Sequence, residues 1–254
     1  MPLLNIGWFS TGRDEAARQL LQAVQDKTCS GDINVKIGFV FSNREPGEAK
    51  ESDLFFELVR SYNIPLVCLS HKRFRTGVEE KDWRIKYDRE VNNRIELFAP
   101  DLCVLAGYML IVSEELCQKY DMINLHPAPP GGPTGSWQEV IWTLIQNKAD
   151  TAGAMMHLVT PKLDRGPVVS YCLFSIKDAP FAEHWRNDDK EMLFRLIRQH
   201  ELAREFPLIL LTLQSLGRGE VGIQNREIID KQGRLISGYD LSGKVDEEVK
   251  KSLE

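Results

Sequence analysis

The feature that most constrains the fold of this chain is an alternation of two hydrophobic patterns over residues 1–126. Short apolar runs such as "INVKIGFVFSN" and "DLCVLAGYM" have the length and composition of buried strands. Between these runs, apolar residues recur at helical spacing, as Tyr87, Val91 and Ile95 do. Regular alternation of strands and helices predicts an α/β fold whose sheet is doubly wound and mostly parallel, with a Rossmann-like N-terminal half.

The C-terminal half follows a different order. The runs "AGAMMHLV" and "GPVVSYCLFSI" predict two strands joined by "TPKLDR", a connection of hairpin length. Residues 188–216 predict a long helix, which Pro207 should kink or divide. We expect one domain over residues 1–225, followed by a C-terminal extension or tail over 226–254 that ends in either a loose tail or a short exposed helix.

The composition restricts the partners. The 254 residues include 32 basic and 37 acidic side chains, and this net charge of −5 argues against a non-specific nucleic-acid surface. No apolar run approaches the roughly 20 residues that a membrane helix needs. The five cysteines form no CxxC motif and no metal-ligand cluster, which is typical of free thiols in a reducing cytoplasm and predicts no metal. We therefore expect a cytoplasmic monomer or homodimer that acts on small molecules.

The stretch "MINLHPAPPGGPTG" places Asn124 and His126 at the end of a predicted strand. Residues at i and i+2 of a strand point to the same face, so both side chains can approach one atom. Asparagine offers an N–H donor and histidine exchanges protons near neutral pH, so the pair could stabilise an oxyanion. Asp164 of "LDRGP" could orient His126, hold a water or take a proton. From the residues alone, turn chemistry or a hydrogen-bonded core pair remains the alternative.

Three segments of the predicted sheet point to one crevice. Gly12, Gly107 and His126 each follow a predicted strand end, and ligands of doubly wound sheets bind beyond the carboxyl ends of the strands. His157 lies on the predicted strand before Asp164. It either packs beneath the site or contacts the catalytic group.

Several stretches resemble, in the same order along the chain, the folate-dependent formyltransferases. They are "FVFSN", "YDRE", "APDLCVLAGYM", "INLHP", "MHLVTPKLDRGPV" and "HELAREFPLIL". The resemblance covers roughly residues 3–225. Within the family, the chain is most similar to the phosphoribosylglycinamide formyltransferases of purine synthesis.

This resemblance implies transfer of a formyl group from 10-formyltetrahydrofolate, as co-substrate, to a primary amine such as that of glycinamide ribonucleotide. It implies that Asn124 and His126 stabilise the oxyanion and that Asp164 governs proton transfer. The residues that it implies for folate binding are Arg84, Met109, Leu110, Ile111, Val112, Thr160, Pro161, Lys162 and Leu163. Those that it implies for binding the acceptor are Thr11, Gly12, Arg13, Arg198 and Glu201.

Two loops depart from the family pattern and leave the acceptor open. The first turn, "STGRDEA", replaces a loop rich in glycine and serine that binds phosphate, and its Asp14 and Glu15 would repel phosphate or serve a helix N-terminus. The loop "APPGGPTGSWQEV" lacks the histidine of the family's mobile segment, and Trp137 could cover the site instead. The alternatives are an amino-sugar nucleotide or an aminoacyl-tRNA as acceptor, a formyl-folate hydrolase, or a non-catalytic folate-binding relative.

Overall fold

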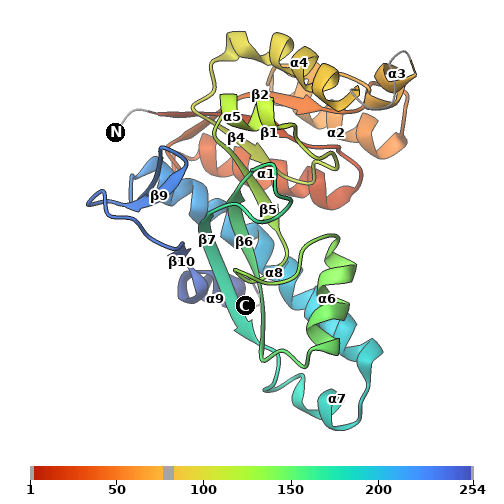
Figure 1. The fold of residues 1–254 in the computed structure, drawn as a ribbon, viewed down its shortest axis with the longest axis vertical. Coiled ribbons are helices and arrows are strands. Elements are labelled where there is room, and N and C mark those ends of the chain that lie inside the picture. The colour runs from red at the N-terminus through yellow and green to blue at the C-terminus, as the bar shows by residue number, and fades with distance from the viewer. Residues whose placement is uncertain (1–2, 77–82, 253–254) are drawn as a thin grey trace. The chain divides into compact units, whose positions relative to one another are not determined.

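The computed structural model describes residues 3–76 and 83–252, and Figure 1 shows the course of the chain. The chain forms two compact units. The first unit comprises residues 1–124 and 159–162, and the second comprises residues 125–158 and 163–254. We describe each unit by itself.

Parallel strands form the centre of the first unit, as the alternating pattern predicts. Its strand order is β5-β4-β1-β2-β3, and each neighbouring pair is parallel. Across the sheet, Asn124 lies beside Leu105, Leu105 beside Phe9, and Phe9 beside Phe41, so the carboxyl ends form one row. The strands are β1 (Leu4–Phe9), β2 (Val35–Ser42), β3 (Leu66–Cys68), β4 (Leu102–Leu105) and β5 (Met122–His126).

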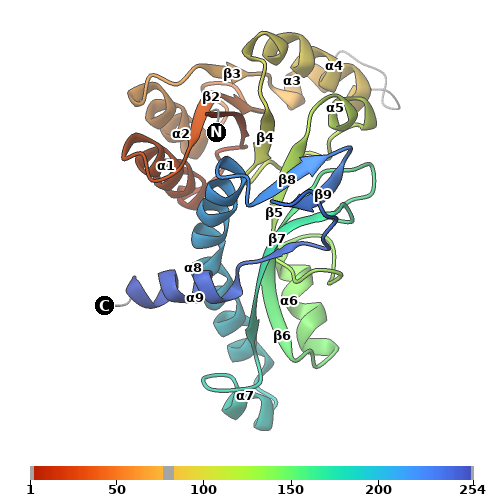
Figure 2. The same cartoon turned by 90° about the vertical axis from the view of Figure 1, so that its left-hand side faces the viewer.

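Helices cover both faces of this sheet, with α1 and α2 on one side and α4 and α5 on the other (Figure 2). Successive strand residues point to opposite faces, so Phe9 and Phe41 join the core beneath α4 and α5, while Trp8 and Val40 are buried toward the opposite face. The doubly wound prediction is thereby confirmed. The helices are α1 (Glu15–Cys29), α2 (Lys50–Ser61), α3 (His71–Arg75), α4 (Trp83–Ile95) and α5 (Glu114–Lys119), with a 3-10 turn, η1 (Glu96–Phe98), after α4.

The second unit contains the predicted hairpin and long helix. Strands β6 (Thr151–Leu158) and β7 (Val168–Ser175) pair in antiparallel fashion, and β10 (Tyr239–Asp240) adds to β7 in parallel. Helix α8 (Lys190–Gly217) begins at its cap, Asp189, and continues through Pro207 without being divided. The remaining elements are α6 (Trp137–Gln146), α7 (Ala182–Arg186), β8 (Val221–Gln224), β9 (Glu227–Asp230) and α9 (Ser242–Lys251).

The extension over residues 226–254 contributes to the second unit. Besides β10, it supplies α9, whose Val245 is buried and whose Asp246 pairs with Arg204 of α8 at 2.9 Å. Of the two forms expected for the last residues, the structure has the helix.

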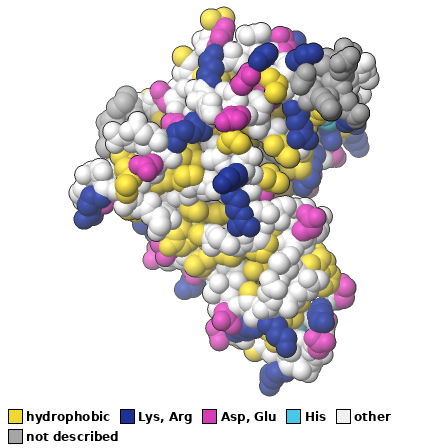
Figure 3. Space-filling view, viewed as in Figure 1, with side chains coloured by type: hydrophobic (Ala, Val, Ile, Leu, Met, Phe, Trp, Pro, Cys, Tyr) yellow, Lys and Arg dark blue, Asp and Glu magenta, His cyan; other side chains and the backbone are white. Residues whose placement is uncertain are grey.

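The surface carries charges of both signs. On the face shown in Figure 3, acidic and basic side chains are interspersed and form no continuous basic surface. Within residues 3–76 and 83–252, none of the helices combines the length and apolarity needed to cross a membrane.

Candidate active site

The core of the candidate site is His126, the last residue of β5. Its ring is almost completely buried, with 3% exposed, and Asn124 lies two residues earlier on the same strand. Because strand side chains alternate, Asn124 and His126 leave the same face of β5, as predicted. The Nε2 atom of His126 lies 3.1 Å from the carbonyl oxygen of Pro133. A carbonyl can only accept, so this nitrogen carries the proton and donates.

Asp164 reaches the same ring from the connection between β6 and β7. Its Oδ2 lies 3.7 Å from Nδ1 of His126 and accepts a hydrogen bond from the Gly135 N–H at 3.2 Å. The backbone of Asp164 has φ +52°, in the left-handed region that aspartate and asparagine tolerate better than most residues. The convergence predicted for Asp164 and His126 is therefore present within the second unit.

His157 of β6 contacts the other carboxylate oxygen. Its Nε2 lies 3.5 Å from Oδ1 of Asp164, and its Nδ1 lies 2.9 Å from the Leu158 carbonyl oxygen. The Asp164 carboxylate thus lies between two imidazole rings. Of the two alternatives for His157, contact with the acidic group is the one that the structure shows.

The proline- and glycine-rich loop after β5 is fastened to these groups. The Pro133 carbonyl accepts from His126, and the Gly135 N–H donates to Asp164. Arg165 donates from Nη1 to the Gly132 carbonyl at 3.1 Å. Sequence reasoning missed these roles, because a loop's backbone partners leave no pattern in the residue types. The only signal was that Arg165 directly follows Asp164.

Burial and neighbouring charges set the ionisation of the site. Burial is the largest influence on His126 and lowers its pKa below the ordinary value, although the Pro133 carbonyl and Asp164 oppose this shift. Burial raises the pKa of Asp164, but the hydrogen bond to His157, the positive charge that His126 carries in acid and the Gly135 N–H outweigh it and leave that pKa below its ordinary value. At neutral pH the site therefore holds a carboxylate next to an uncharged His126 ring.

This arrangement can accept a proton and donate hydrogen bonds. With its proton on Nε2, His126 presents a lone pair on Nδ1 on the side of Asp164. Nδ1 of His126 and the carboxylate of Asp164 can each accept a proton from a group that approaches them. The neighbouring Asn124 amide can donate to a developing oxyanion. Among the described residues, no group of three or more His, Cys, Asp or Glu side chains could hold a metal ion.

The first turn, expected at the acceptor, is built differently from a phosphate-binding loop. The N–H of Thr11 donates to the Gly107 carbonyl at 3.1 Å, and the N–H of Gly12 donates to Oγ of Ser10 at 3.2 Å. Both donors are therefore engaged within the first unit. Gly12 has φ +61°, and a Cβ atom there would lie 2.8 Å from the Phe55 ring, so only glycine fits this turn.

The charged residues of the first turn mainly serve helix α1. Asp14 is the N-cap and accepts from the Ala17 N–H at 3.0 Å, and its Oδ2 lies 3.1 Å from Nε of Arg13. Nη1 of Arg13 lies 3.0 Å from Sδ of Met109. The positive charge of Arg13 is therefore largely offset by the carboxylate beside it.

In the first unit, the segments that we expect to bind folate lie next to one hydrophobic cluster. Trp83, Val112 and Val159 belong to the same core group, and Leu110 packs against it. Arg84 is exposed, and its guanidinium lies 5.6 Å from the centre of the Trp83 ring.

Most of the remaining residues expected at the folate are accessible. Thr160 is half-buried and donates to the Lys162 carbonyl at 3.1 Å, while Pro161 is exposed like Lys162. Large apolar side chains that remain exposed in these segments are Met109, Ile111 and Leu163, at 51%, 43% and 50%.

Arg198 and Glu201 of α8 differ sharply in exposure. Arg198 is half-buried, lies 4.6 Å from the centre of the Trp137 ring and pairs with Glu205 at 2.6 Å. Glu201 is completely buried and lies 3.8 Å from Arg198, and neither of its carboxylate oxygens makes a hydrogen bond to a described residue. Burial is the main cause of a Glu201 pKa well above the ordinary value; the charge of Glu205 acts in the same direction, and Arg198 opposes it.

The chain is similar to known proteins over more than half of its length. The model of the formyl transferase family matches residues 14–183. The phosphoribosylglycinamide formyltransferase of Escherichia coli is 32% identical over 156 residues, which are 59% of this chain and 64% of that protein. A formyltetrahydrofolate deformylase of Haemophilus influenzae is 26% identical over 163 residues, which are 62% of this chain and 51% of the deformylase. Each of these two alignments spans less than two thirds of the relative's own length.

The fold agrees with solved structures over a longer stretch. The structure of the phosphoribosylglycinamide formyltransferase of Coxiella burnetii superposes with a TM-score of 0.72 and covers 94% of this chain and 99% of that one, at 21% identity. The family model includes Asn124, His126, His157 and Asp164 within its matched range. The chain belongs to the formyl transferase family.

Proposed function

We propose that this chain transfers a formyl group from 10-formyltetrahydrofolate to a primary amine, and that the amine is that of glycinamide ribonucleotide in purine biosynthesis. The observation that carries the proposal is the Asp164 carboxylate held between His126 and His157 within the range that matches the formyl transferase family. The folate acts as a co-substrate, and no step requires a metal. The five free cysteines fit a reducing compartment such as the cytoplasm.

The first step is attack of the amine on the formyl carbon. The formyl oxygen then becomes an oxyanion, and hydrogen-bond donors already in place at that oxygen lower the barrier. Asn124 donates from its side-chain amide, and His126 donates from Nδ1 once that atom has taken up a proton. Both side chains leave the same face of β5, as this role requires.

The second requirement is removal of a proton from the attacking amine. Oδ2 of Asp164 and Nδ1 of His126 face each other at 3.7 Å, so a proton leaving the amine has two acceptors. The proton then passes to the folate nitrogen that loses the formyl group, which balances the transfer. His157 and the Gly135 N–H hold Asp164 in its ionised form during this sequence.

For substrate binding we propose the segments that the family resemblance implies. The folate contacts Arg84, the backbone of 109–112 and the backbone of 160–163. The acceptor contacts Thr11, Gly12, Arg13, Arg198 and Glu201. Because the Glu201 carboxyl is completely buried, its contact with an acceptor requires a neighbouring side chain to move.

A turnover screen tests the proposal. Purified protein is incubated with 10-formyltetrahydrofolate and, separately, with glycinamide ribonucleotide, an amino-sugar nucleotide or an aminoacyl-tRNA, and loss of the formyl folate is followed. We expect consumption only with glycinamide ribonucleotide. Consumption with another amine would keep the chemistry and replace the acceptor. Folate binding without consumption, seen as a raised melting temperature, would show a non-catalytic relative.

Hydrolysis is the second candidate, because the chain also aligns with a formyltetrahydrofolate deformylase. In that reaction a water replaces the amine, and the same His126 and Asp164 atoms would take its proton. Release of formate in the absence of any amine, at a rate equal to that with glycinamide ribonucleotide, would favour hydrolysis over transfer.

A further inference from the structure

The first turn leaves the acceptor's phosphate short of partners. The Thr11 N–H donates to the Gly107 carbonyl, and the Gly12 N–H donates to Oγ of Ser10. The charge of Arg13 is offset by Asp14. A phosphate monoester bound there needs hydrogen-bond donors with positive charge. A cation from a neighbouring strand end of the first unit can supply them.

Arg44 is anchored beside this turn. It follows β2 by two residues, and its Nη1 donates to Oγ of Ser52 at 2.9 Å. Ser52 is completely buried in the first turn of α2, and its hydroxyl donates to the Thr11 carbonyl at 3.2 Å. The guanidinium is therefore two hydrogen bonds away from the turn after β1.

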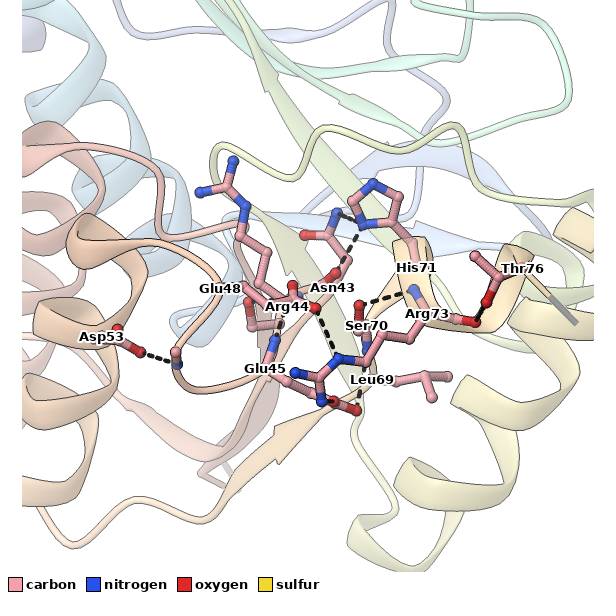
Figure 4. Close-up of polar contacts among 12 residues, drawn as sticks. Asn43, Arg44, Glu45, Glu48, Asp53, Leu69, Ser70, His71, Arg73 and Thr76 are labelled. Carbon is pink, nitrogen blue, oxygen red and sulfur yellow. Dashed lines mark hydrogen bonds and ion pairs between the residues drawn. The ribbon is translucent and has the colours of Figure 1, made fainter.

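No described carboxylate pairs with Arg44, although four acidic residues lie within nine positions of it in the sequence. Among the described residues, Arg44 forms no ion pair and its side chain donates only to a neutral hydroxyl. The nearby acidic side chains serve other groups: Glu45 and Glu48 pair with Arg73, Glu51 pairs with Arg18, and Asp53 accepts from the Gly47 N–H. In Figure 4 the Arg44 guanidinium extends away from the Glu45–Arg73 pair.

The amide of Asn43 supplies a second donor. Asn43 is 1% exposed, and Nδ1 of His71 lies 2.8 Å from its backbone carbonyl, so this ring nitrogen carries a proton. In the structure the same Nδ1 lies 3.2 Å from Nδ2 of Asn43, and because two donors cannot share this contact, we infer that the amide is turned so that its oxygen occupies this position. The opposite end of the amide, Oδ1 in the structure, is buried and has no partner among the described residues, and in the turned amide it is the nitrogen. In Figure 4 this end of Asn43 is on the side of Arg44.

The register of the sheet fits an acceptor that reaches from Asn124 to this point. Asn124 of β5 and Phe41 of β2, the strand that Arg44 follows, lie in the same row of the sheet, with β4 and β1 between them. Three strand spacings amount to about 14 Å. A ribose 5-phosphate that carries a two-carbon amine, together with the length of the Arg44 side chain, can span this distance.

We propose that Arg44, together with the amide of Asn43, binds the phosphate of the acceptor in place of the backbone donors of the first turn. This inference rests on the proposed function for its ligand, but its site consists entirely of residues in the first unit. Arg44 then determines specificity for a phosphorylated amine and takes no part in the chemistry of the formyl group.

The test compares Arg44→Gln with Arg60→Gln, which removes the same charge from the exposed far end of α2. Binding of ribose 5-phosphate is measured by calorimetry, and KM is measured for glycinamide ribonucleotide and for the formyl folate. We expect Arg44→Gln to weaken both phosphate ligands about ten- to a hundredfold, as loss of hydrogen bonds from a charged group does, with the folate KM unchanged. Arg60→Gln should behave as the wild type, and Arg44→Lys should recover part of the affinity because it keeps the charge without the planar fork.

The outcomes separate this inference from the proposed function. Wild-type affinity for ribose 5-phosphate in a folded Arg44→Gln variant would overturn it, as would an equal loss in Arg60→Gln. If the wild type formylates no amine but binds ribose 5-phosphate through Arg44, the proposed function fails and the phosphate site stands. The thermal midpoint of each variant, measured alongside, identifies any loss caused by unfolding.

Discussion

Replacing Asp164 with asparagine removes one negative charge and leaves the shape of the site almost unchanged. Asp164 has φ +52°, a conformation that asparagine also tolerates, so the substitution avoids the backbone strain that alanine would add. The side chain is 8% exposed, and its carboxylate contacts His126 at 3.7 Å, His157 at 3.5 Å and the Gly135 N–H at 3.2 Å. The amide oxygen of asparagine can still accept from Gly135, but the charge between the two rings is lost.

The expected loss of activity is much larger than the expected loss of stability. A group that transfers a proton in the transition state contributes about 10²–10⁴ in rate, so kcat should fall within that range. The change also removes one charge-assisted interaction, worth about 1.5–3 kcal/mol. For a chain of this size each kcal/mol shifts the melting temperature by about 2–4 °C, so Asp164→Asn should remain folded at the temperature of the assay.

The assay is steady-state formyl transfer with both substrates varied, accompanied by thermal unfolding of each protein. The account predicts a large fall in kcat with little change in the KM of the folate, because Asp164 acts on the proton and not on folate binding. A folded Asp164→Asn protein that keeps more than about a tenth of the wild-type kcat would refute the reasoning, since removing such a proton-transfer group costs at least about a hundredfold.

Two further predictions concern the histidines. His157→Gln removes a contact that holds Asp164 ionised, so the acidic limb of the pH–rate profile should move to higher pH and kcat should fall about tenfold; an unchanged profile would limit His157 to packing. The pKa of His126 is lower in the folded protein than in the unfolded chain, so below about pH 6.5 the unfolded chain binds more protons and stability falls as the pH drops through the folded-state pKa. Urea unfolding at pH 7.5 and 5.5 should therefore show a greater loss of stability for the wild type than for His126→Gln, and equal losses would contradict this assignment.

Much of the fold could be predicted from the sequence because long elements repeat their pattern. The strands from β1 to β5 are short, apolar and separated by amphipathic helices, and burial on both faces follows from that composition. Helices α3 and α7 have five residues each, too few for a helical period to be detected, and both were missed. Helix α8 continues through Pro207, so of the two effects predicted for this proline, a kink or a division, the division does not occur.

In the candidate site, the reactive side chains could be predicted from the sequence, but their backbone partners could not. Asn124, His126 and Asp164 could be selected because their residue types carry the chemistry, and the structure brings the last two together. The sequence could not show that the Pro133 carbonyl fixes the His126 tautomer, or that the N–H groups of the first turn are already engaged. These facts depend on backbone atoms, which are the same in every residue type. The role that we propose for Arg44 likewise depends on Ser52, eight residues later in the chain. The Ser52 hydroxyl accepts from Arg44 and donates to the Thr11 carbonyl in the turn after β1.

The most direct test of the central claim follows the formyl carbon itself. The protein is mixed with 10-formyltetrahydrofolate labelled with ¹³C in the formyl group and with glycinamide ribonucleotide, and the label is followed by NMR. The account predicts that the label appears as an N-formyl group on the ribonucleotide, and that this signal is lost in Asp164→Asn. Label that accumulates as free formate, or that stays on the folate while the protein is folded and binds it, would contradict formyl transfer by this site.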